Sequence, residues 1–559
     1  MTDQPSSVVD DLADRFWEAL LELQPTTATM YGDERYADRL EDPSDVGRAK
    51  ELALWRSTRR ETESIPIDGL SVEDRITVDM IKVICDLGIE AQDQRTDVLR
   101  VVDQMGGPQT LLPVVTQFQK ADTPERFEKY ESRLRAYPAF MAANSDLLRE
   151  GRASGLTAPR IVVERTIAQL ERILEAPVDE SPIPATAQVA SEADRERVRE
   201  IVRDVVRPAD RVFLDSLRGD YLAASREDPG LWSAPNGDAL YRTQIRAWTT
   251  VDMDPALIHQ IGLDELETID EERRAISAAA GYGDDTVALR KAQDDDPANC
   301  PRTKDELLER AREDIARALT IAPRYFGTMP RAGLEVRPVE EYKEADSPFA
   351  YYYPPAADGG RPGIYYANGY DLPSRKYTKL ATTTYHEAVP GHHFQISLEM
   401  ENPKLNVFRR LGARIIGGAY VEGWGLYSER LADEMGLFRT EGERFGMLDA
   451  QAWRAARLVV DTGLHALRWS RQQSIDFLLS AGLSATDATI ETDRYIAWPG
   501  QALTYKLGQR AIESLRRELT ERDGSRFDLR EFHDQVLGHG SLPLATLARE
   551  LPTWVTTPA

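Results

Sequence analysis

Apolar residues recur every three or four positions along most of the 559-residue chain, and this spacing is the feature that most limits its fold. Over residues 9–20 the apolar side chains fall on one helical face, and Pro25 ends the pattern. The stretch 303–323 begins with Thr303 and Glu306 in the spacing of a helix-capping box. The spacing therefore predicts a mainly α-helical fold.

One short region favours strands instead. "FAYYYPP" (349–355) and "GIYYAN" (363–368) are aromatic and β-rich, and they flank a turn-like segment. We expect a small hairpin or sheet here, immediately before the main cluster of histidines. The length of the chain permits one large unit with two lobes. We divide it into a helical lobe, 1–330, and a second lobe, 331–559, that contains the histidine cluster.

The charge of the chain limits its partners and its compartment. Asp and Glu number 94 and Lys and Arg number 69, which gives a net charge of −25. Such acidity argues against binding nucleic acids or anionic membranes. The two cysteines, Cys85 and Cys300, cannot form a disulfide framework. The N-terminal segment has neither the basic start nor the apolar core of a signal peptide, and no run of about 18 apolar residues exists. We therefore expect a cytoplasmic protein.

Three of the seven histidines lie within eight positions, in "TTTYHEAVPGHHFQ" (382–395). The zinc motif His-Glu-x-x-His places two histidines on one helical face and a Glu beside the water that the metal activates. Here His386 and Glu387 supply the first half, but Pro390 stands where the second histidine belongs. On an unbroken helix, neither His392 nor His393 would share a zinc ion with His386.

Pro390 and Gly391 make an unbroken helix unfavourable, because proline removes a backbone hydrogen bond and glycine tolerates unusual dihedral angles. We predict a two-residue bulge that returns His392 to the position of the second ligand, with His393 as the competitor. The alternative is a corner between two helices that contains histidines and binds no metal.

Two glutamates downstream supply a context for a metal site. Glu422 and Glu429 are seven residues apart in "GGAYVEGWGLYSERLADEMG" (417–436), so they share a helical face. A carboxylate from a separate helix is the usual third ligand of such a zinc site. We assign this role to Glu422, and we expect Glu429 to accept the free N–H of a ligating histidine. The alternative is that both glutamates face solvent.

Two further segments contain candidate catalytic side chains. His465 follows Asp461 by four residues, so it is either a stabiliser of the transition state or a histidine held by its own helix. Tyr505 lies in "DRYIAWPGQALTYKLGQ" (493–509) and is a candidate donor to a developing oxyanion.

The same segment, 493–509, contains candidate substrate-binding residues. Arg494 and Lys506 are candidates to bind a substrate carboxylate, and Tyr495 is a second candidate donor. The alternative for each is ordinary packing, since a buried tyrosine needs only a partner for its hydroxyl group.

Several motifs together resemble the bacterial domain-of-unknown-function family 885, over nearly the full chain. They are "YHEAVPGHHFQ", "EGWGLYSERL", "DTGLHALRWS", "RYIAWPGQALTYKLGQ", "GSLPLATLARE" and the N-terminal "DLADRFWEALLELQPTTATMYGDERYADRLED". The resemblance implies a largely helical, two-lobed, zincin-like metallopeptidase fold.

More distantly, the chain is similar to Taq-type zinc carboxypeptidases and thimet-like oligopeptidases. The Taq-type family has two glutamates seven apart, the first of which binds metal, and Glu422 and Glu429 reproduce that spacing. Dipeptidyl peptidase III tolerates a one-residue insertion in its His-Glu motif. By analogy this favours His392 over His393.

From these observations we expect a peptidase with one zinc ion per chain, held by His386, His392 and Glu422. Glu387 would act as the general base, Tyr505 or His465 would polarise the scissile carbonyl, and short peptides would be the substrates. An extended peptide would pair with the strand at 363–368. The alternatives are a metal-dependent hydrolase of a non-peptide amide or ester, and a non-catalytic protein that keeps the fold and the metal.

Overall fold

The computed structural model describes residues 7–340, 344, 347–356, 360–412, 415–416 and 418–555. The chain forms two compact units. Unit 1 comprises Met1–Thr243, Leu464–Gln473 and Thr489–Pro499, and unit 2 comprises Gln244–Gly463, Ser474–Ala488 and Gly500–Ala559. Residues 244–330 thus belong with the histidine cluster in unit 2, whereas we had divided the chain at 330.

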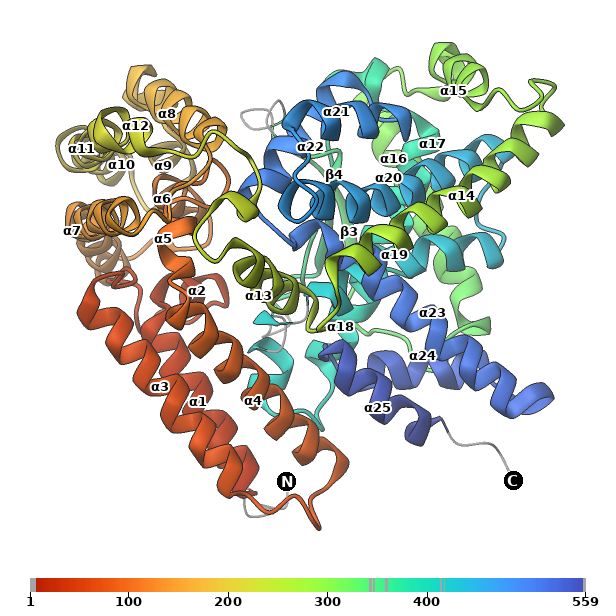
Figure 1. The fold of residues 1–559 in the computed structure, drawn as a ribbon, viewed down its shortest axis with the longest axis horizontal. Helices are drawn as coiled ribbons and strands as arrows, with labels where there is room; N and C mark the ends of the chain where they lie inside the picture. Colours follow the sequence, from red (N-terminus) through yellow and green to blue (C-terminus); the bar gives the residue numbers. More distant parts are fainter. Residues whose placement is uncertain are drawn as a thin grey trace. The chain divides into compact units, whose positions relative to one another are not determined.

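Unit 1 is helical (Figure 1), and its described residues include a short parallel strand pair. The first residues of α13 (Gly237–Thr249) belong to unit 1, and its residues from Gln244 onward belong to unit 2. The other elements of unit 1 are α1 (Val8–Leu23), α2 (Pro25–Met30), α3 (Asp45–Ser64), α4 (Val72–Asp93), α5 (Thr96–Arg100), α6 (Pro108–Thr116), β1 (Lys120–Ala121), α7 (Pro124–Ser154), α8 (Arg160–Glu175), α9 (Pro182–Thr186), β2 (Gln188–Val189), α10 (Glu192–Ile201), α11 (Arg207–Ser216) and α12 (Leu222–Ala224).

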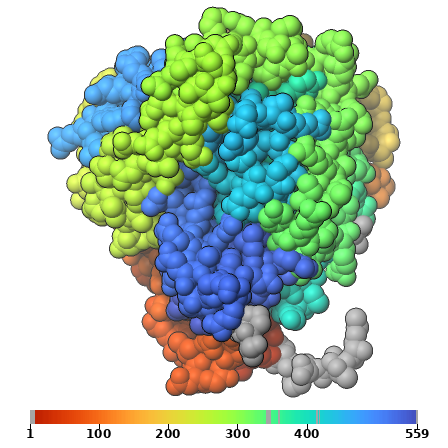
Figure 2. Space-filling view, turned by 90° about the vertical axis from the view of Figure 1, so that its right-hand side faces the viewer, coloured from red at the N-terminus to blue at the C-terminus, as the bar shows by residue number. Residues whose placement is uncertain are grey.

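Unit 2 surrounds a small sheet with helices. The last residues of α20, the first residues of α21 and most of α22, from Thr489 onward, belong to unit 1. Figure 2 shows one face on which the dark blue C-terminal helices lie beside light blue and green segments of unit 2. Its elements are α14 (Pro255–Ala279), α15 (Thr286–Asp295), α16 (Lys304–Ile321), β3 (Leu334–Pro338), β4 (Ala350–Tyr353), β5 (Gly363–Ala367), α17 (Tyr377–Glu387), α18 (His392–Glu401), α19 (Gly418–Glu434), α20 (Glu441–His465), α21 (Arg471–Ser480), α22 (Ala485–Ala497), α23 (Thr504–Asp523), α24 (Leu529–Gly538) and α25 (Leu544–Trp554).

The helices begin where their capping residues predict. In α1, the Ser7 side chain accepts a hydrogen bond from the backbone N–H of Asp10, and the apolar face is buried. In α16, Thr303 accepts from the backbone N–H of Glu306 at 3.1 Å. The prediction of a mainly helical fold is therefore confirmed. Within the described residues, no helix is both long enough and apolar enough to cross a membrane.

The predicted strands form a three-stranded sheet in the order β3-β5-β4. The aromatic segments become β4 and β5, which pair antiparallel with Tyr352 opposite Tyr365. Strand β3 adds to the other edge of β5 in parallel, with Val336 opposite Tyr365. Because β5 has a neighbour on both sides, the expectation that an incoming peptide pairs with residues 363–368 is wrong. The edge strands of this sheet are β3 and β4.

Helices α19 and α23 cross at unusually short range because two glycines meet at the crossing point. A Cβ atom at Gly423 would lie 2.4 Å from the backbone of Gly508, and one at Gly508 would lie 1.8 Å from the carbonyl oxygen of Ala419. Side chains at both positions are therefore excluded. The crossing fixes the positions of two nearby residues relative to each other. They are Glu422, which precedes Gly423 on α19, and Tyr505, which lies three residues before Gly508 on α23.

Candidate metal centre

The histidine-rich segment is a break between two helices, whereas we had predicted a bulge within one. Helix α17 ends at Glu387, and α18 begins at His392. The backbone leaves the helical region at Ala388 (φ −107°, ψ −97°) and again at Gly391 (φ −77°, ψ −130°). The physical reason is that Pro390 cannot continue the hydrogen-bond ladder of α17. The chain therefore turns and starts a new helix.

The turn between α17 and α18 is fixed by two neighbours. A Cβ atom at Gly391 would lie 1.8 Å from the carbonyl oxygen of His386, so only glycine fits there. The indole N–H of Trp424 on α19 donates to the carbonyl of Pro390 at 3.0 Å. These contacts hold the last residues of α17 and the first residue of α18 against α19.

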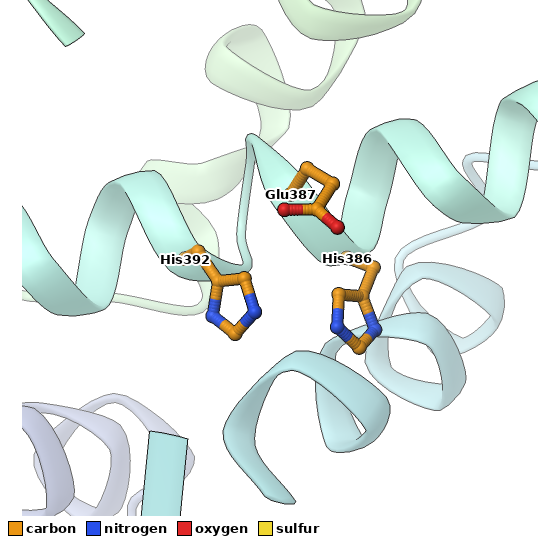
Figure 3. A group of neighbouring side chains, drawn as sticks. All are labelled: His386, Glu387 and His392. Atoms are coloured by element: carbon orange, nitrogen blue, oxygen red, sulfur yellow. The ribbon is translucent and has the colours of Figure 1, made fainter. Parts of the chain in front are cut away.

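The turn brings His386, Glu387 and His392 together. Figure 3 shows the two imidazoles side by side below the helix break, with the carboxylate of Glu387 above them. Their ligand atoms all lie within 4.8 Å of one another. The two imidazole rings are 4.8 Å apart between centroids and almost perpendicular. These three side chains form a group that could hold a metal ion.

Glu422 on α19 faces both imidazoles. Its Oε2 atom lies 3.4 Å from Nε2 of His386 and 3.6 Å from Nε2 of His392. The ligand atoms of a tetrahedral zinc site, with bonds of 2.0–2.2 Å, lie about 3.3–3.6 Å apart. The distances from Glu422 to the two imidazoles therefore suit a common metal ion.

Each of the two imidazoles is oriented through its other nitrogen. Nδ1 of His386 lies 2.8 Å from Oε1 of Glu429, whose Oε2 accepts from the hydroxyl of Thr382 at 2.8 Å. Nδ1 of His392 faces the side-chain oxygen of Gln395 at 3.4 Å. Such partners fix which nitrogen of a histidine is available to a metal. Sequence reasoning found Glu429 but missed Gln395, whose only signal was its position three residues after His392.

His393, the competitor of His392, lies in a different environment. Its Nδ1 atom is 3.0 Å from the hydroxyl of Tyr352 on β4 and 3.3 Å from the hydroxyl of Ser397. Burial lowers the pKa of His393 to about 4, so the ring is neutral near pH 7. His393 therefore packs α18 against the sheet, while His392 faces the cluster.

The histidines and glutamates of the cluster shift one another's pKa values. Burial lowers the pKa of His386, but hydrogen bonds to Glu422 and Glu429 outweigh it and raise that pKa to about 9. Burial likewise raises the pKa of Glu422, yet its hydrogen bonds to His386 and His392 bring it well below the usual range. A proton and a metal ion would compete for the same place between these side chains.

Glu387 behaves differently from Glu422. Burial raises its pKa, and the nearby Glu422 carboxylate adds to this effect, while His392 and His386 oppose it. A carboxylate with a raised pKa is a better proton acceptor near neutral pH. The two acidic side chains of the cluster thus have their pKa values shifted in opposite directions.

Tyr505 lies beside the cluster, together with residues of α20 that the sequence did not single out. Its ring centroid is 6.3 Å from that of His386. The guanidinium carbons of Arg454 and Arg457 lie 5.9 Å and 4.5 Å from the Tyr505 ring centroid. Arg454 also reaches within 4.0 Å of Glu429. Nothing in the local sequence distinguished these arginines from surface residues of an amphipathic helix.

His465 belongs to unit 1, and its ring is fully buried there. Its Nδ1 accepts from the backbone N–H of Leu231 at 3.2 Å, and its Nε2 lies 3.0 Å from the carbonyl oxygen of Tyr495. Burial lowers its pKa to about 4. Both nitrogens therefore serve the packing of unit 1, and we give His465 no catalytic role. Asp461, the expected partner of His465 on the same helix, accepts a hydrogen bond from the backbone N–H of Gly500 at 3.0 Å.

The three expected substrate-binding residues have other partners. The ammonium group of Lys506 is buried, donates to Gln451 at 2.8 Å and lies 3.5 Å from Glu265. Tyr495 is buried in unit 1, and Arg494 pairs with Glu491 on its own helix at 3.5 Å. An ammonium group enclosed in this way cannot bind a substrate carboxylate, so we withdraw that role for Lys506.

Fold and site together define a mainly helical protein with a His-Glu-His group that could hold a metal ion. The chain belongs to family DUF885, described as "Bacterial protein of unknown function", whose sequence profile matches residues 25–551. No curated protein matches the chain.

Two solved structures are similar to the chain along almost its whole length. One, from Colwellia psychrerythraea, is 30% identical, has a TM-score of 0.91 and covers 98% of each chain. The other, from Shewanella oneidensis, is 18% identical, has a TM-score of 0.76 and covers 97% of this chain and 99% of its own. The first is described as a "putative lipoprotein" and the second as a "putative lipoprotein of unknown function". This finding overturns our expectation of a cytoplasmic protein.

Proposed function

We propose that this chain is a zinc-dependent hydrolase that cleaves short peptides. The observation that carries the proposal is that Oε2 of Glu422 lies at zinc-like ligand spacing from Nε2 of both His386 and His392, with a second carboxylate of raised pKa beside them. A structural zinc site has four protein ligands and no need of a base. Three ligands and an adjacent glutamate instead suit an open, catalytic site.

His386, His392 and Glu422 would hold the ion, and their chemistry fits it. Two neutral imidazoles and one carboxylate are a common ligand set of catalytic zinc. When bound, zinc supplies Lewis acidity, which lowers the pKa of water to about 7 and polarises a carbonyl group. Glu429 and Gln395 would leave the two Nε2 atoms available to the ion, because they occupy the Nδ1 atoms through the hydrogen bonds described above.

Glu387 would act as the general base. It would accept a proton from the attacking water and pass it to the nitrogen of the leaving amine. Its raised pKa suits both steps, because the carboxylate must accept a proton and then release it at a similar pH. Tyr505 would donate a hydrogen bond to the oxyanion that develops on the scissile carbonyl. Its ring beside His386 supports this role.

The two alternatives predict different results. A non-peptide amide or ester hydrolase would share the water activation and differ only in substrate. A non-catalytic metal-binding protein would bind the ion without turnover. Such a protein needs no general base, so it would not need a carboxylate of raised pKa at position 387. The likeness to proteins described as lipoproteins supports a location in the bacterial envelope, which fractionation of cells would test.

A library of short peptides, followed by mass spectrometry, tests the proposal. Protein loaded with one equivalent of zinc should cleave some members, and the same protein treated with a chelator should cleave none. Cleavage of esters or acylated amides without any peptide cleavage would favour the non-peptide alternative. Full metal occupancy with no turnover on any substrate would favour the non-catalytic one.

A further inference from the structure

Two arginines of α20 lie next to the candidate metal centre and share two aromatic rings. The guanidinium carbons of Arg454 and Arg457 lie 4.6 Å and 4.7 Å from the centroid of the Trp453 ring. Both also lie over the Tyr505 ring, which in turn packs against His386. All of these residues belong to unit 2. Two guanidinium groups are thus one aromatic ring away from a metal-binding imidazole.

The guanidinium group of Arg454 has few hydrogen-bond partners. Within the described part of the chain, its guanidinium makes one hydrogen bond, from Nη1 to the carbonyl of Ala450 in its own helix at 3.3 Å. Its Nη2 atom is 4.0 Å from Glu429, beyond hydrogen-bond distance, and its buried Nε has no hydrogen-bond partner among the described residues. Buried donors are normally paired, so an orphaned one calls for an explanation.

Neutralisation of the nearby glutamates does not fully explain the position of Arg454. A guanidinium that only neutralised the acidic cluster would be expected to bond a carboxylate directly, as Arg430 does with Glu272 through two contacts of 2.8 Å in the same unit. Arg454 lies instead on aromatic faces, which hold a cation without using its N–H donors. Its Nε and Nη2 donors, which make no hydrogen bond among the described residues, therefore remain available for a ligand that reaches the metal centre.

We propose that Arg454 forms a subsite for a carboxylate group of the substrate. This inference rests on the hydrolase function proposed above and names the substrate class of that same site. Guanidinium groups bind carboxylates through two parallel N–H donors, which fixes both position and orientation. The Tyr505 ring separates Arg454 from His386, and a peptide advances about 3.3–3.6 Å per residue. The carboxylate would thus lie one or two residues from the bond that is cleaved.

A free C-terminal carboxylate and the side chain of Asp or Glu share this chemistry. Peptides with a free carboxyl end, the same peptides with an amidated end, and amidated peptides with one Asp or Glu distinguish the two sources. Preference for the free end identifies the terminal carboxylate, and preference for the acidic amidated peptides identifies a side chain. Equal cleavage of neutral amidated peptides overturns the proposal.

Calorimetric titration tests the subsite without hydrolysis. The probes are N-acetyl-leucine, which has a carboxylate, and N-acetyl-leucinol, its neutral counterpart, each added to the zinc-loaded protein. We expect Arg454→Gln to weaken N-acetyl-leucine binding at least tenfold and to leave N-acetyl-leucinol binding unchanged. Arg517→Gln is the matched control, since Arg517 is exposed on α23 and contacts Ser514. It should bind both probes as the wild type does.

Arg454→Lys provides a second variant if Arg454→Gln does not fold, because lysine keeps the charge and loses the planar pair of donors. It should also weaken binding of the carboxylate probe. Absence of N-acetyl-leucine binding, equal binding of both probes, or wild-type binding by the folded arginine variants would each overturn the subsite. A wild-type protein that binds N-acetyl-leucine but hydrolyses nothing contradicts the proposed function instead.

Discussion

Gly425 lies directly against the imidazole of His386. A Cβ atom at position 425 would be 2.6 Å from Nε2, the nitrogen that faces Glu422. This glycine lets α19 approach the histidine closely enough for Glu422, one turn earlier on the same helix, to reach both imidazoles.

Replacing Gly425 with alanine should therefore impair metal binding before it unfolds the protein. The added methyl group must push either His386 or α19 away, and we expect zinc affinity to fall about tenfold or more, as measured by competition with a fluorescent chelator. Gly538→Ala is the control, because a Cβ at this position meets nothing within 4 Å. Unchanged affinity in Gly425→Ala would show that the ligand atoms tolerate displacement.

The hydrogen bond from His386 to Glu429 should contribute to metal affinity as well. Glu429→Gln removes the negative charge that stabilises the ring and leaves the shape almost unchanged. Loss of such a partner typically costs about 10–100-fold in affinity or activity. The matched control is Glu434→Gln at the end of the same helix, where the carboxylate pairs with Arg516. Equal zinc affinities of the two variants would contradict an orienting role for Glu429.

The metal-free protein should lose stability as the pH rises from about 6.5 to 9. In the folded state the pKa of His386 is raised from 6.5 to about 9, so folding favours the protonated ring. That contribution is complete below pH 6.5 and disappears as the pH passes 9. Thermal unfolding at several pH values measures it. In the zinc-loaded protein the ion replaces the proton, so the same pH range should have little effect on the unfolding temperature.

Glu387→Gln should keep the metal and lose activity. The amide has nearly the same shape as the carboxylate but accepts no proton, and a general base typically contributes about 10²–10⁴-fold. Turnover of whichever peptide the library screen identifies is the measurement, with metal content determined on the same sample. Glu401→Gln is a control on α18, where the carboxylate accepts from Arg331 and Ala332. Wild-type turnover in Glu387→Gln would exclude this residue as the base.

Features determined by local sequence could be predicted. The apolar stripe of α1, the Thr303 cap of α16 and the aromatic strands β4 and β5 follow from spacing and residue type alone. Strand β3 could not be predicted, because "LEVRP" lacks the aromatic residues of its neighbour and is a strand only through pairing with β5. Its addition is what converts β5 from an edge into the centre of the sheet.

The site was predictable where the sequence specified chemistry and unpredictable where tertiary contacts decide. The spacing of Glu422 and Glu429 placed both on the face of α19 that meets His386. Burial cannot be read from residue type, so Lys506 and His465 looked available although both are enclosed. Arg454 and Arg457 were missed for the opposite reason, since only the fold brings α20 beside Tyr505.

Metal content of three purified proteins tests most directly whether His386, His392 and Glu422 form a zinc site. Wild type, His392→Ala and His393→Ala are loaded with zinc, dialysed and measured by mass spectrometry of the metal. We predict about one zinc ion per chain in the wild type and in His393→Ala, and almost none in His392→Ala. A wild type without zinc, or a His392→Ala protein that keeps its zinc while His393→Ala loses it, would contradict the site.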